Sequence, residues 1–328
     1  MKLAIVGATG VVGREILEVI SERRVPFTEL FLVASERSCG KSILFEGKRR
    51  EVISLSELLN KNVDLALFSA GQEIAKNWAP KLAAMGCRVV DNSSYWRMRS
   101  KHKLIVPEIN GNQLLQEDFI ISNPNCSTIQ LAMVLAPLHE RYVAKRAVVS
   151  TYQAVSGSGK KAIKQLKNEQ NNTQGETFYL HQIFQNVLPQ CDDFVENGYT
   201  KEEMKITNEI KKIIDKNIDV VATAVRVPVF RGHSESVNIT FENNFNVSEI
   251  RHILSQTSGV TVLDIPERKE YPMPINTRKK DDVFVGRIRK DFTQKNTLNI
   301  WIVADNLRKG AATNTVQIAE YLIATNFV

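Results

Sequence analysis

KLAIVGATGVVG, residues 2–13, opens with five residues typical of a short buried strand and continues directly into a glycine-rich turn. Its glycines, Gly7, Gly10 and Gly13, have the spacing GxxGxxG and precede a stretch expected to be helical, residues 12–21. Glycines between a strand and a helix permit a tight turn and let the backbone approach a pyrophosphate, which the helix N-terminus attracts. Plain strand-to-helix turns can also carry glycines, but this position in the chain favours a dinucleotide-binding loop.

The segments that follow predict a doubly wound α/β domain. Apolar strands are expected at residues 30–34, 65–68 and 88–91, and a helix at residues 72–85 separates the last two. Strands that alternate with helices at this spacing form parallel sheets, with connections that are nearly always right-handed. We therefore expect a Rossmann-type domain over residues 1–124.

A second domain is predicted where the pattern changes, over residues 125–305. Its strands are expected to be longer and richer in β-branched residues, and two helices interrupt them, at residues 160–170 and 201–215. This pattern indicates an α+β domain on a larger antiparallel sheet. A last helix, within residues 306–328, is expected to return and complete the first domain. The expected strands cover residues 147–154, 220–227, 236–241 and 297–304.

Composition limits the classes of partner. The chain has 328 residues, of which 43% are hydrophobic and 24% charged, as in ordinary globular proteins, so a disordered chain is excluded. Its net charge of +7 is dispersed and no zinc-finger or RNA-binding motif accompanies it, which favours small anionic ligands over nucleic acid. No apolar run has the length of a membrane span, and no signal peptide precedes the first strand, so we expect a cytoplasmic protein.

The end of the second expected strand indicates which nucleotide binds. Sites for NAD commonly place Asp or Glu there, to accept a hydrogen bond from the ribose 2′-hydroxyl. Here the sequence is ASERS, residues 34–38, in which Ser35, Arg37 and Ser38 can donate hydrogen bonds to a 2′-phosphate. Glu36 argues against this only if it faces the ligand, and it could instead face solvent. The cofactor is therefore predicted to be NADP(H).

The candidate nucleophile is Cys126, in the segment SNPNCST, residues 122–128. Pro124 ends any preceding regular element, and Asn125 or Ser127 can cap the helix expected directly afterwards. At a helix N-terminus the partial positive charge favours the thiolate, which is the reactive form of cysteine. The alternative is a small buried hydrophobic residue, which is the usual role of cysteine.

The remaining cysteines, Cys39, Cys87 and Cys191, lack such a setting. Four cysteines without CxxC or metal-ligand spacing indicate a reducing compartment and no metal site. Among the histidines, His233 is well placed to move protons, because it lies in a glycine-containing turn beside a strand end. A single histidine more often has no catalytic role, so the pattern alone leaves this assignment open.

Eight motifs follow one another along the chain: GATGVVG (7–13), NSSYWRM (92–98), SNPNCST (122–128), YQAVSGSG (152–159), EEMK (202–205), RVPVFRGHSES (226–236), DDVFVGRIRKD (281–291) and DNLRKGAA (305–312). Together they resemble the motifs of the aspartate-β-semialdehyde dehydrogenase family. They occur in the family's order between residues 7 and 312, so the resemblance covers nearly the whole chain. It implies an NADPH-dependent reductive dephosphorylation of L-aspartyl-4-phosphate through a cysteine thioester, and a homodimer built through the second, catalytic domain.

The resemblance implies a role for each matching residue. Cys126 matches the nucleophile, His233 the general acid/base, and Gln153 the residue that orients the thioester. The implied substrate contacts are Arg226 for the α-carboxylate, Glu202 for the amino group, and Arg97 and Lys205, with Asn125 nearby, for the phosphate. The cofactor contacts are Gly7, Thr9, Gly10, Val11, Val12, Ser35, Arg37, Ser38, Ser156, Gly157 and Asn306.

Other interpretations remain open at this point. An N-acetyl-γ-glutamyl-phosphate reductase would share the fold and the thioester chemistry, but its blocked substrate amine would have no use for the Glu202 carboxylate. A non-catalytic nucleotide-binding paralogue would be expected to lose Cys126 or His233, and this chain has both. A nucleic-acid binder would require steeply salt-dependent binding.

Overall fold

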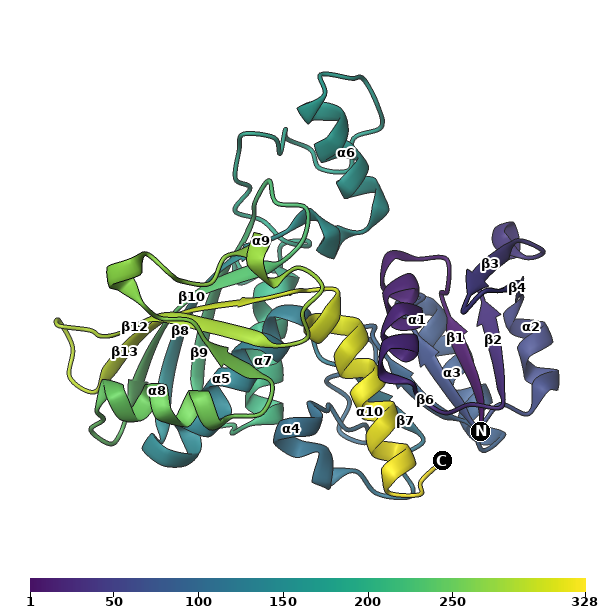
Figure 1. Cartoon of the computed structure of the whole chain (residues 1–328), viewed down its shortest axis with the longest axis horizontal. Helices are drawn as coiled ribbons and strands as arrows, with labels where there is room; N and C mark the ends of the chain where they lie inside the picture. Colours follow the sequence, from purple (N-terminus) through teal and green to yellow (C-terminus); the bar gives the residue numbers. More distant parts are fainter. The chain divides into compact units, whose positions relative to one another are not determined.

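The computed structural model describes all 328 residues, and the chain divides into two compact units (Figure 1). Unit 1 comprises residues 1–124 and 311–328, and unit 2 comprises residues 125–310. Each unit has its own sheet, of seven strands in unit 1 and six in unit 2. No helix is both long and apolar enough to cross a lipid bilayer.

The sheet of unit 1 has the strand order β3-β4-β2-β1-β5-β6-β7. Its strands are β1 (Lys2–Val6), β2 (Glu29–Val33), β3 (Ser42–Phe45), β4 (Lys48–Ile53), β5 (Leu65–Phe68), β6 (Arg88–Asp91) and β7 (Ile120–Ser122). Neighbouring strands are parallel except β3 and β4, which form an antiparallel hairpin at one edge. The order reverses at β1, as it does in doubly wound folds.

Helices cover both faces of this sheet. They are α1 (Val11–Arg23), α2 (Leu55–Leu58), α3 (Gln72–Ala84), α4 (Pro107–Asn110) and α10 (Thr313–Ala324). Leu3 and Ile5 of β1 join one core with α1 and α10, whereas Ala4 and Val6 join the opposite core with α3. Because successive strand side chains point to opposite faces, a continuous apolar run suits a strand that is packed on both sides. Figure 1 shows α10 beside α1.

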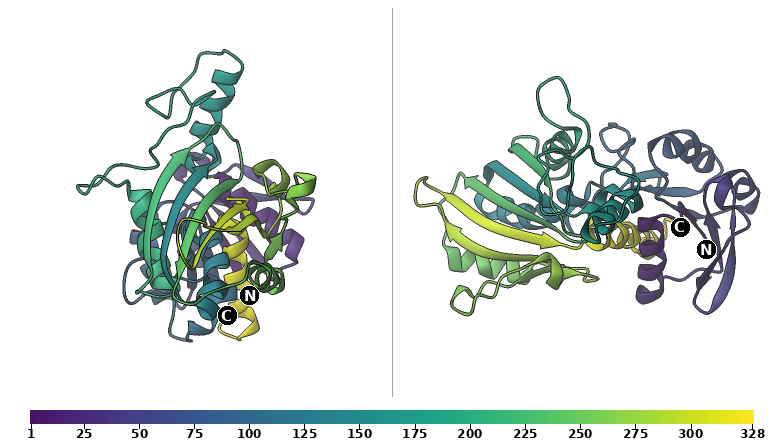
Figure 2. Two further views of the ribbon diagram at one scale, coloured as in Figure 1. Left: turned by 90° about the vertical axis from the view of Figure 1, so that its left-hand side faces the viewer. Right: turned by 90° about the horizontal axis from the view of Figure 1, so that it is seen from above.

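The sheet of unit 2 has the strand order β11-β12-β13-β10-β8-β9. Its strands are β8 (Ala144–Gln153), β9 (Asp219–Arg226), β10 (His233–Phe241), β11 (Val260–Val262), β12 (Val283–Lys290) and β13 (Thr297–Ala304). The expected antiparallel sheet is only partly correct, because β8 and β9 are parallel, as are β11 and β12. A long crossover connects each of these two pairs, and a crossover returns the chain in the same direction. Figure 2 shows the curvature of the long strands.

Three helices pack against this sheet: α5 (Cys126–Tyr142), α7 (Lys201–Ile213) and α8 (Val247–Gln256). Helix α5 also packs against both α7 and α8. Along β9 and β10 one set of alternate residues is buried, and the other set is more exposed. Helix α6 (Lys160–Gln170) has a small separate core, which includes Val155, Ile183 and Leu188. A short helix, α9 (Pro274–Thr277), precedes β12.

The C-terminal helix is shorter than predicted. A helix was expected within residues 306–328, but a π-helical turn occupies Arg308–Ala312 and α10 begins only at Thr313. The cause is a local turn at Asp305, whose carboxylate accepts from the Leu307 N–H while its carbonyl accepts from the Arg308 N–H. Side-chain to backbone bonds of this kind compete with helical hydrogen bonding.

Candidate active site

Cys126 is the first residue of α5, and Asn125 is its N-cap. The Asn125 side-chain oxygen accepts hydrogen bonds from the backbone N–H groups of Ser127, at 2.9 Å, and Thr128, at 3.4 Å. An N-cap satisfies donors that have no partner within the helix, and the aligned peptide dipoles leave partial positive charge at this end. Of the two candidate caps, Asn125 and Ser127, the structure has Asn125. The thiol lies at the electropositive end of a 17-residue helix.

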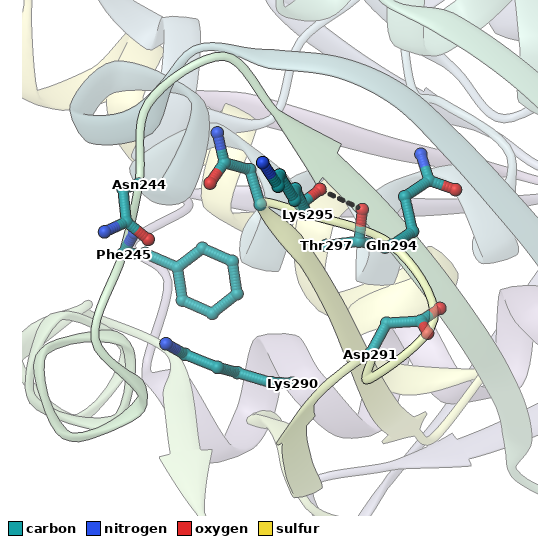
Figure 3. A pocket seen from close by; sticks show the side chains of 8 residues that line it. Asn244, Phe245, Lys290, Asp291, Gln294, Lys295 and Thr297 are labelled. Carbon is teal, nitrogen blue, oxygen red and sulfur yellow. Dashed lines mark hydrogen bonds between the residues drawn. The ribbon is translucent and has the colours of Figure 1, made fainter.

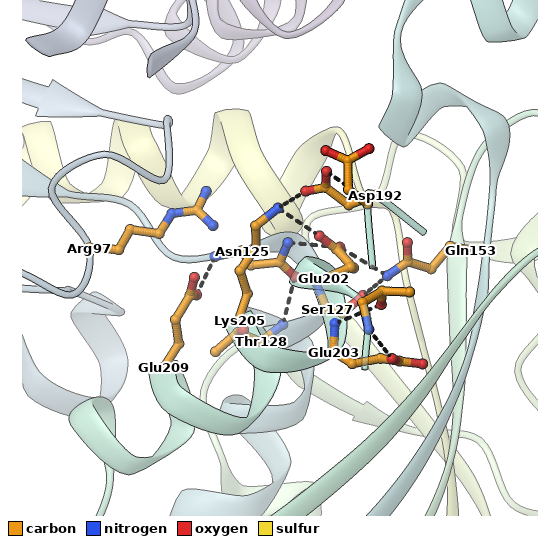
Figure 4. A network of polar contacts seen from close by, with 12 residues as sticks. Arg97, Asn125, Ser127, Thr128, Gln153, Asp192, Glu202, Glu203, Lys205 and Glu209 are labelled. Carbon is orange, nitrogen blue, oxygen red and sulfur yellow. Dashed lines mark hydrogen bonds and ion pairs between the residues drawn. The ribbon is translucent and has the colours of Figure 1, made fainter. Parts of the chain in front are cut away.

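Helix α7 holds the Asn125 residue at two points (Figure 4). Its Glu202 accepts from the Asn125 side-chain nitrogen at 2.8 Å, and its Glu209 accepts from the Asn125 backbone N–H at 2.7 Å. Glu202 and Glu209 are seven residues apart, so they lie on one face of the helix. Glu209 was missed in the sequence, because its partner is 84 residues away and no local pattern connects them.

Gln153, at the end of β8, connects the nucleophile segment to α7. Its Nε2 donates to Oγ of Ser127 at 2.7 Å and to Oε1 of Glu202 at 3.2 Å. Ser127 directly follows Cys126, so the amide of Gln153 is fixed one residue from the thiol. The orienting role that the resemblance implies for Gln153 stays a prediction.

His233 is fully buried and is the first residue of β10, which begins three residues earlier than expected. Its Nδ1 accepts a hydrogen bond from the Ala154 N–H at 3.0 Å, so a neutral ring carries its proton on Nε2. Nε2 has no hydrogen-bond partner among the protein atoms. Burial, together with the charge of Arg226, lowers the pKa of His233 to about 3, and Glu202 opposes this only in part. The ring is therefore neutral near pH 7.

Arg226 ends β9 and contacts Ala154, the residue directly after β8 that also binds the imidazole. Its Nη1 donates to the Ala154 carbonyl oxygen at 2.8 Å, while Nε has no partner. Gly157 lies against both groups, since a Cβ there would be 3.1 Å from Nη1 of Arg226 and 3.2 Å from Nε2 of His233. The loop after β8 thus approaches the imidazole and the guanidinium as closely as a glycine permits.

Lys205, on α7, forms ion pairs with Glu202 of the same helix and with Asp192, which precedes the helix. Its Nζ lies 3.1 Å from Oε2 of Glu202 and 2.7 Å from Oδ2 of Asp192. Burial acts to lower the pKa of Lys205, but Glu202 and Asp192 raise it above its ordinary value. Burial would raise the pKa of Glu202, yet Lys205, Asn125 and Arg226 together lower it to about 2. Both groups are therefore charged at neutral pH.

The start of α7 is fixed by a capping box, which the sequence analysis above does not predict. Thr200 Oγ1 accepts from the Glu203 N–H, and the Glu203 carboxylate accepts from the Thr200 N–H at 2.6 Å. The other Glu203 oxygen accepts from the Ala224 N–H of β9 at 2.8 Å. The pattern TxxE, residues 200–203, is the local signal that predicts such a cap.

The predicted loop residues Ser156, Gly157 and Asn306 also meet in unit 2. Oγ of Ser156 lies 3.1 Å from Oδ1 and 3.0 Å from Nδ2 of Asn306. Oδ1 of Asn306 also accepts from the Gly232 N–H at 2.9 Å, directly before His233. Gly310 packs against the nucleophile, since a Cβ there would be 2.8 Å from Cβ of Cys126. These contacts tie the loop after β13 to the thiol and the imidazole.

None of the four cysteines forms a disulfide, and they differ in setting. Cys126 is partly exposed, whereas Cys87 and Cys191 are buried. Burial raises the pKa of Cys87 and that of Cys191 to about 12. Burial and the Glu36 carboxylate also raise the pKa of Cys39. Three of the thiols are therefore held in the unreactive protonated form, as the sequence predicted.

In unit 1 the glycine-rich turn connects β1 to α1. Gly7 has a φ of +90°, and a Cβ on it would be 2.2 Å from the Ser69 carbonyl oxygen. A Cβ on Gly13 would be 2.2 Å from the Gly7 carbonyl oxygen. Both positions therefore require glycine. Gly10 is the N-cap of α1 without a side-chain cap, and the predicted residues Thr9, Val11 and Val12 lie on either side of it.

The end of β2 carries donors and no inward-facing acid. Ser35, Glu36 and Arg37 are exposed, and Ser38 is half-buried, in a 3₁₀ turn that covers Glu36–Ser38.

Arg97, the predicted phosphate contact, also belongs to unit 1, where it is buried and its Nη2 donates to the Asn92 carbonyl at 2.8 Å. No group of three His, Cys, Asp or Glu side chains is placed to hold a metal ion.

A separate surface pocket lies near the turn between β12 and β13 (Figure 3). It is lined by Phe245 and by polar side chains that include Lys290, Asp291 and Lys295. None of its lining residues is a cysteine or a histidine, so it lacks the groups expected for thioester chemistry. The residues around Cys126 remain the candidate active site.

Two family models cover most of the chain. Residues 2–117 match "Semialdehyde dehydrogenase, NAD binding domain", and residues 135–309 match "Semialdehyde dehydrogenase, dimerisation domain". A curated relative from Aquifex aeolicus, "Aspartate-semialdehyde dehydrogenase", is 51% identical, with 100% of this chain and 99% of the relative covered. The chain belongs to the aspartate-semialdehyde dehydrogenase family. The Bacillus subtilis aspartate-semialdehyde dehydrogenase is 42% identical, over 100% of this chain and 99% of that protein.

Solved aspartate-semialdehyde dehydrogenases have the same fold. The Vibrio cholerae aspartate semialdehyde dehydrogenase II complexed with ASA has a TM-score of 0.94 and 43% identity, with 98% of each chain covered. The Candida albicans enzyme with NADP has a TM-score of 0.78 and 25% identity, with 100% of this chain and 99% of that chain covered. The predicted fold class and family are confirmed. As an aspartate-semialdehyde dehydrogenase family member, the chain is an oxidoreductase, and the reductase and non-catalytic alternatives are not favoured.

Proposed function

We propose that this chain catalyses the NADPH-dependent reductive dephosphorylation of L-aspartyl-4-phosphate to L-aspartate 4-semialdehyde and phosphate, reversibly, through a thioester on Cys126. One observation carries the proposal. Cys126 begins a helix, the next residue is held by Gln153, and the residue after Gln153 is held by His233. The thiol and the imidazole are thereby fastened to one strand end, although they are 107 residues apart in the sequence.

The residues of unit 1 fit NADP(H). The backbone of the GxxGxxG turn approaches its neighbours too closely for any side chain at Gly7 or Gly13, as a pyrophosphate-binding turn requires. Ser35, Arg37 and Ser38 supply hydroxyl and guanidinium donors for a 2′-phosphate. The exposed Glu36 has its carboxylate beside Cys39. When bound, NADPH supplies the hydride that reduces the thioester.

Cys126 acts as the nucleophile. Its thiolate forms a C–S bond to the acyl carbon, and the C–O bond to phosphate breaks, so that phosphate leaves with the bonding electrons. After reduction, the thiohemiacetal oxyanion re-forms a C=O bond and expels the thiolate, which releases the aldehyde. The helix N-terminus of α5 stabilises the thiolate before attack and after release.

His233 donates a hydrogen bond to the acyl oxygen of the substrate. This oxygen becomes negative both when the thiolate attacks and when the thioester is reduced. With Nδ1 accepting from Ala154, its Nε2–H is free to donate to this oxyanion, and Gln153 holds the neighbouring segment. A buried, preorganised donor stabilises developing charge more than a solvated one. A neutral ring whose pKa is lowered to about 3 enters the reaction as a donor, and the acid/base role follows when charge develops on the substrate.

The charged groups of the substrate have complementary partners. Arg226 is proposed to bind the α-carboxylate as a two-pronged donor, and Glu202 the α-amino group. Lys205 and Arg97 are proposed to bind the phosphate, with Asn125 beside the leaving group. In the structure Lys205 contacts Glu202 and Asp192, so we infer that phosphate binding rearranges this contact.

The proposal also covers assembly and context. The match of residues 135–309 to a dimerisation domain supports a homodimer. Cys39, Cys87 and Cys191 form no disulfide and their thiols are protonated, which fits a reducing compartment such as the cytoplasm. The product aldehyde would serve lysine, threonine and methionine biosynthesis, diaminopimelate included.

The test is formation of NADPH from L-aspartate 4-semialdehyde and NADP in the presence of phosphate or arsenate. We expect activity that depends on the anion and is abolished in Cys126→Ser, whereas Cys191→Ser keeps it. Undiminished activity of Cys126→Ser would overturn the mechanism. N-acetyl-glutamate semialdehyde should be a poor substrate, because its blocked amine cannot pair with Glu202.

A further inference from the structure

A buried carboxyl group lies behind the catalytic residues without a hydrogen-bond partner. Glu235, on β10, is fully buried, and both of its side-chain oxygens are unpaired. Such groups are rare in folded proteins, because leaving a buried polar atom without a hydrogen bond destabilises the fold. A group retained at this cost requires an explanation.

Glu235 lies on the same strand and the same sheet face as the catalytic His233. His233 and Glu235 are two apart on β10, and Gln153 and Thr151 are two apart on β8, so each pair shares one face of the sheet. The register pairs Glu235 with Thr151 directly. On α5, which packs on both strands, Gln130 lies one turn after Cys126.

These three residues form a second polar layer: Glu235, Thr151 and Gln130. Thr151 is fully buried and Gln130 almost so, and their side-chain polar atoms also lack hydrogen-bond partners. The Gln130 amide lies near enough to the carboxyl to influence its ionisation. A small rotation about the broad terminal torsions of Gln130 and Glu235 can complete hydrogen bonds among the three.

The carboxyl group is in its neutral form. Burial raises the pKa of Glu235 well above its ordinary value, and the Gln130 amide opposes this only in part. Thr151, Ile302 and Gln130 face it from β8, β13 and α5, and none of them is charged. His233, on the same face of β10, is itself neutral because its pKa is lowered. An ionised carboxylate here would have no cation to compensate its burial.

We propose that Glu235, as a neutral carboxylic acid, is a positioning residue that joins α5 to β8 and β10 through Gln130 and Thr151. It thereby sets the separation of Cys126 and His233, one layer in front. This inference rests on the proposed roles of the thiol and the imidazole. A neutral acid can donate one hydrogen bond and accept others, so it can serve both an amide and a hydroxyl at once.

The test compares Glu235→Gln, a neutral side chain of the same shape, with Glu235→Leu, an apolar one. Glu235→Gln should keep kcat within about twofold, whereas Glu235→Leu should lose roughly tenfold to a hundredfold in kcat with little change in KM. Ser236→Ala, on the exposed side of the same strand, is the matched control and should leave both constants unchanged. Wild-type kcat in a folded Glu235→Leu protein, or equal losses in both variants, would overturn the proposal.

A second measurement does not depend on activity. The carboxyl ionises near its ordinary value of 4.5 in the unfolded chain but stays protonated in the folded chain, so wild-type stability falls as the pH rises above this value. The melting temperature of Glu235→Gln relative to wild type should therefore increase from about pH 5 to about pH 8. A constant difference would show an ionised carboxylate and overturn the proposal.

If Glu235→Leu does not fold, Thr151→Val and Gln130→Leu should show the same kcat-selective loss, and unchanged kcat in both would overturn it. An inactive wild-type enzyme would instead contradict the proposed function.

Discussion

The backbone N–H of Ala154 donates a hydrogen bond to Nδ1 of His233 at 3.0 Å. The same residue accepts, through its carbonyl oxygen, from Arg226. One peptide segment at the end of β8 therefore sets both the tautomer of the imidazole and the place of the guanidinium. The neutrality of His233 follows from this arrangement, since burial and the Arg226 charge oppose protonation of the ring.

The buried imidazole should make the folded protein sensitive to acid. The unfolded chain takes up a proton near pH 6.5, whereas the folded chain does so only near pH 3, so stability falls as the pH is lowered through this range. The slope contributed by this group is at most about 1.4 kcal/mol per pH unit. We expect His233→Gln to show a shallower loss of melting temperature than wild type between about pH 6.5 and pH 4.5. Parallel curves would contradict the buried neutral ring.

The cap of α5 should matter for catalysis as well as for stability. Asn125→Ala removes the acceptor for two backbone N–H groups and should cost about 1 kcal/mol of unfolding free energy. Asn246→Ala, which removes the cap of α8, is the matched control with a similar stability loss. Only Asn125→Ala should also lower kcat and slow alkylation of Cys126 by iodoacetamide. Equal kinetics in the two variants would separate the cap from the chemistry.

Arg226→Lys keeps the charge but loses the two-pronged donor geometry. If Arg226 binds the α-carboxylate, KM for aspartate semialdehyde should rise roughly 10- to 100-fold, which corresponds to about 1.4–2.8 kcal/mol. Arg251 lies on α8 and is paired with Asp264, and Arg251→Lys should leave KM unchanged. Steady-state kinetics decide, and an unaltered KM in Arg226→Lys would assign the carboxylate to another group.

The choice of nucleotide can be tested at the end of β2. Arg37→Ala should raise KM for NADPH roughly tenfold and leave KM for NADH nearly unchanged, because only NADPH carries the 2′-phosphate. Lys41→Ala removes an exposed positive charge four residues later and should affect neither constant. Equal effects on the two nucleotides would mean that Arg37 does not read the phosphate.

Unit 1 could be predicted largely from local sequence, because its central strands are apolar on both faces and are separated by amphipathic segments. The hairpin of β3 and β4 was missed, since Lys48, Arg49, Arg50 and Glu51 give β4 a polar appearance at the sheet edge. In unit 2 the parallel pairing of β8 with β9 was also missed. Strand pairing depends on the path of the chain between strands, which alternation within each strand does not reveal.

The candidate site divides in the same way. Cys126 at a helix start was predictable, because Pro124 and Asn125 are local signals. The hydrogen bond from the Asn125 backbone to Glu209 and the burial of Glu235 could not be predicted, because each depends on elements far apart in the sequence. The capping box of Thr200 and Glu203, by contrast, has a local sequence signal in the pattern TxxE.

The uneven settings of the four thiols also make this chain a convenient subject for spectroscopy. Because Cys87 and Cys191 are enclosed and Cys39 is held protonated, a single-equivalent electrophilic dye added near neutral pH should attach at position 126 of the unmodified protein. Such a reporter would sit at the reaction centre itself. Quenching or polarisation of its emission could then follow the arrival of nucleotide in real time, with no engineered cysteine-free background.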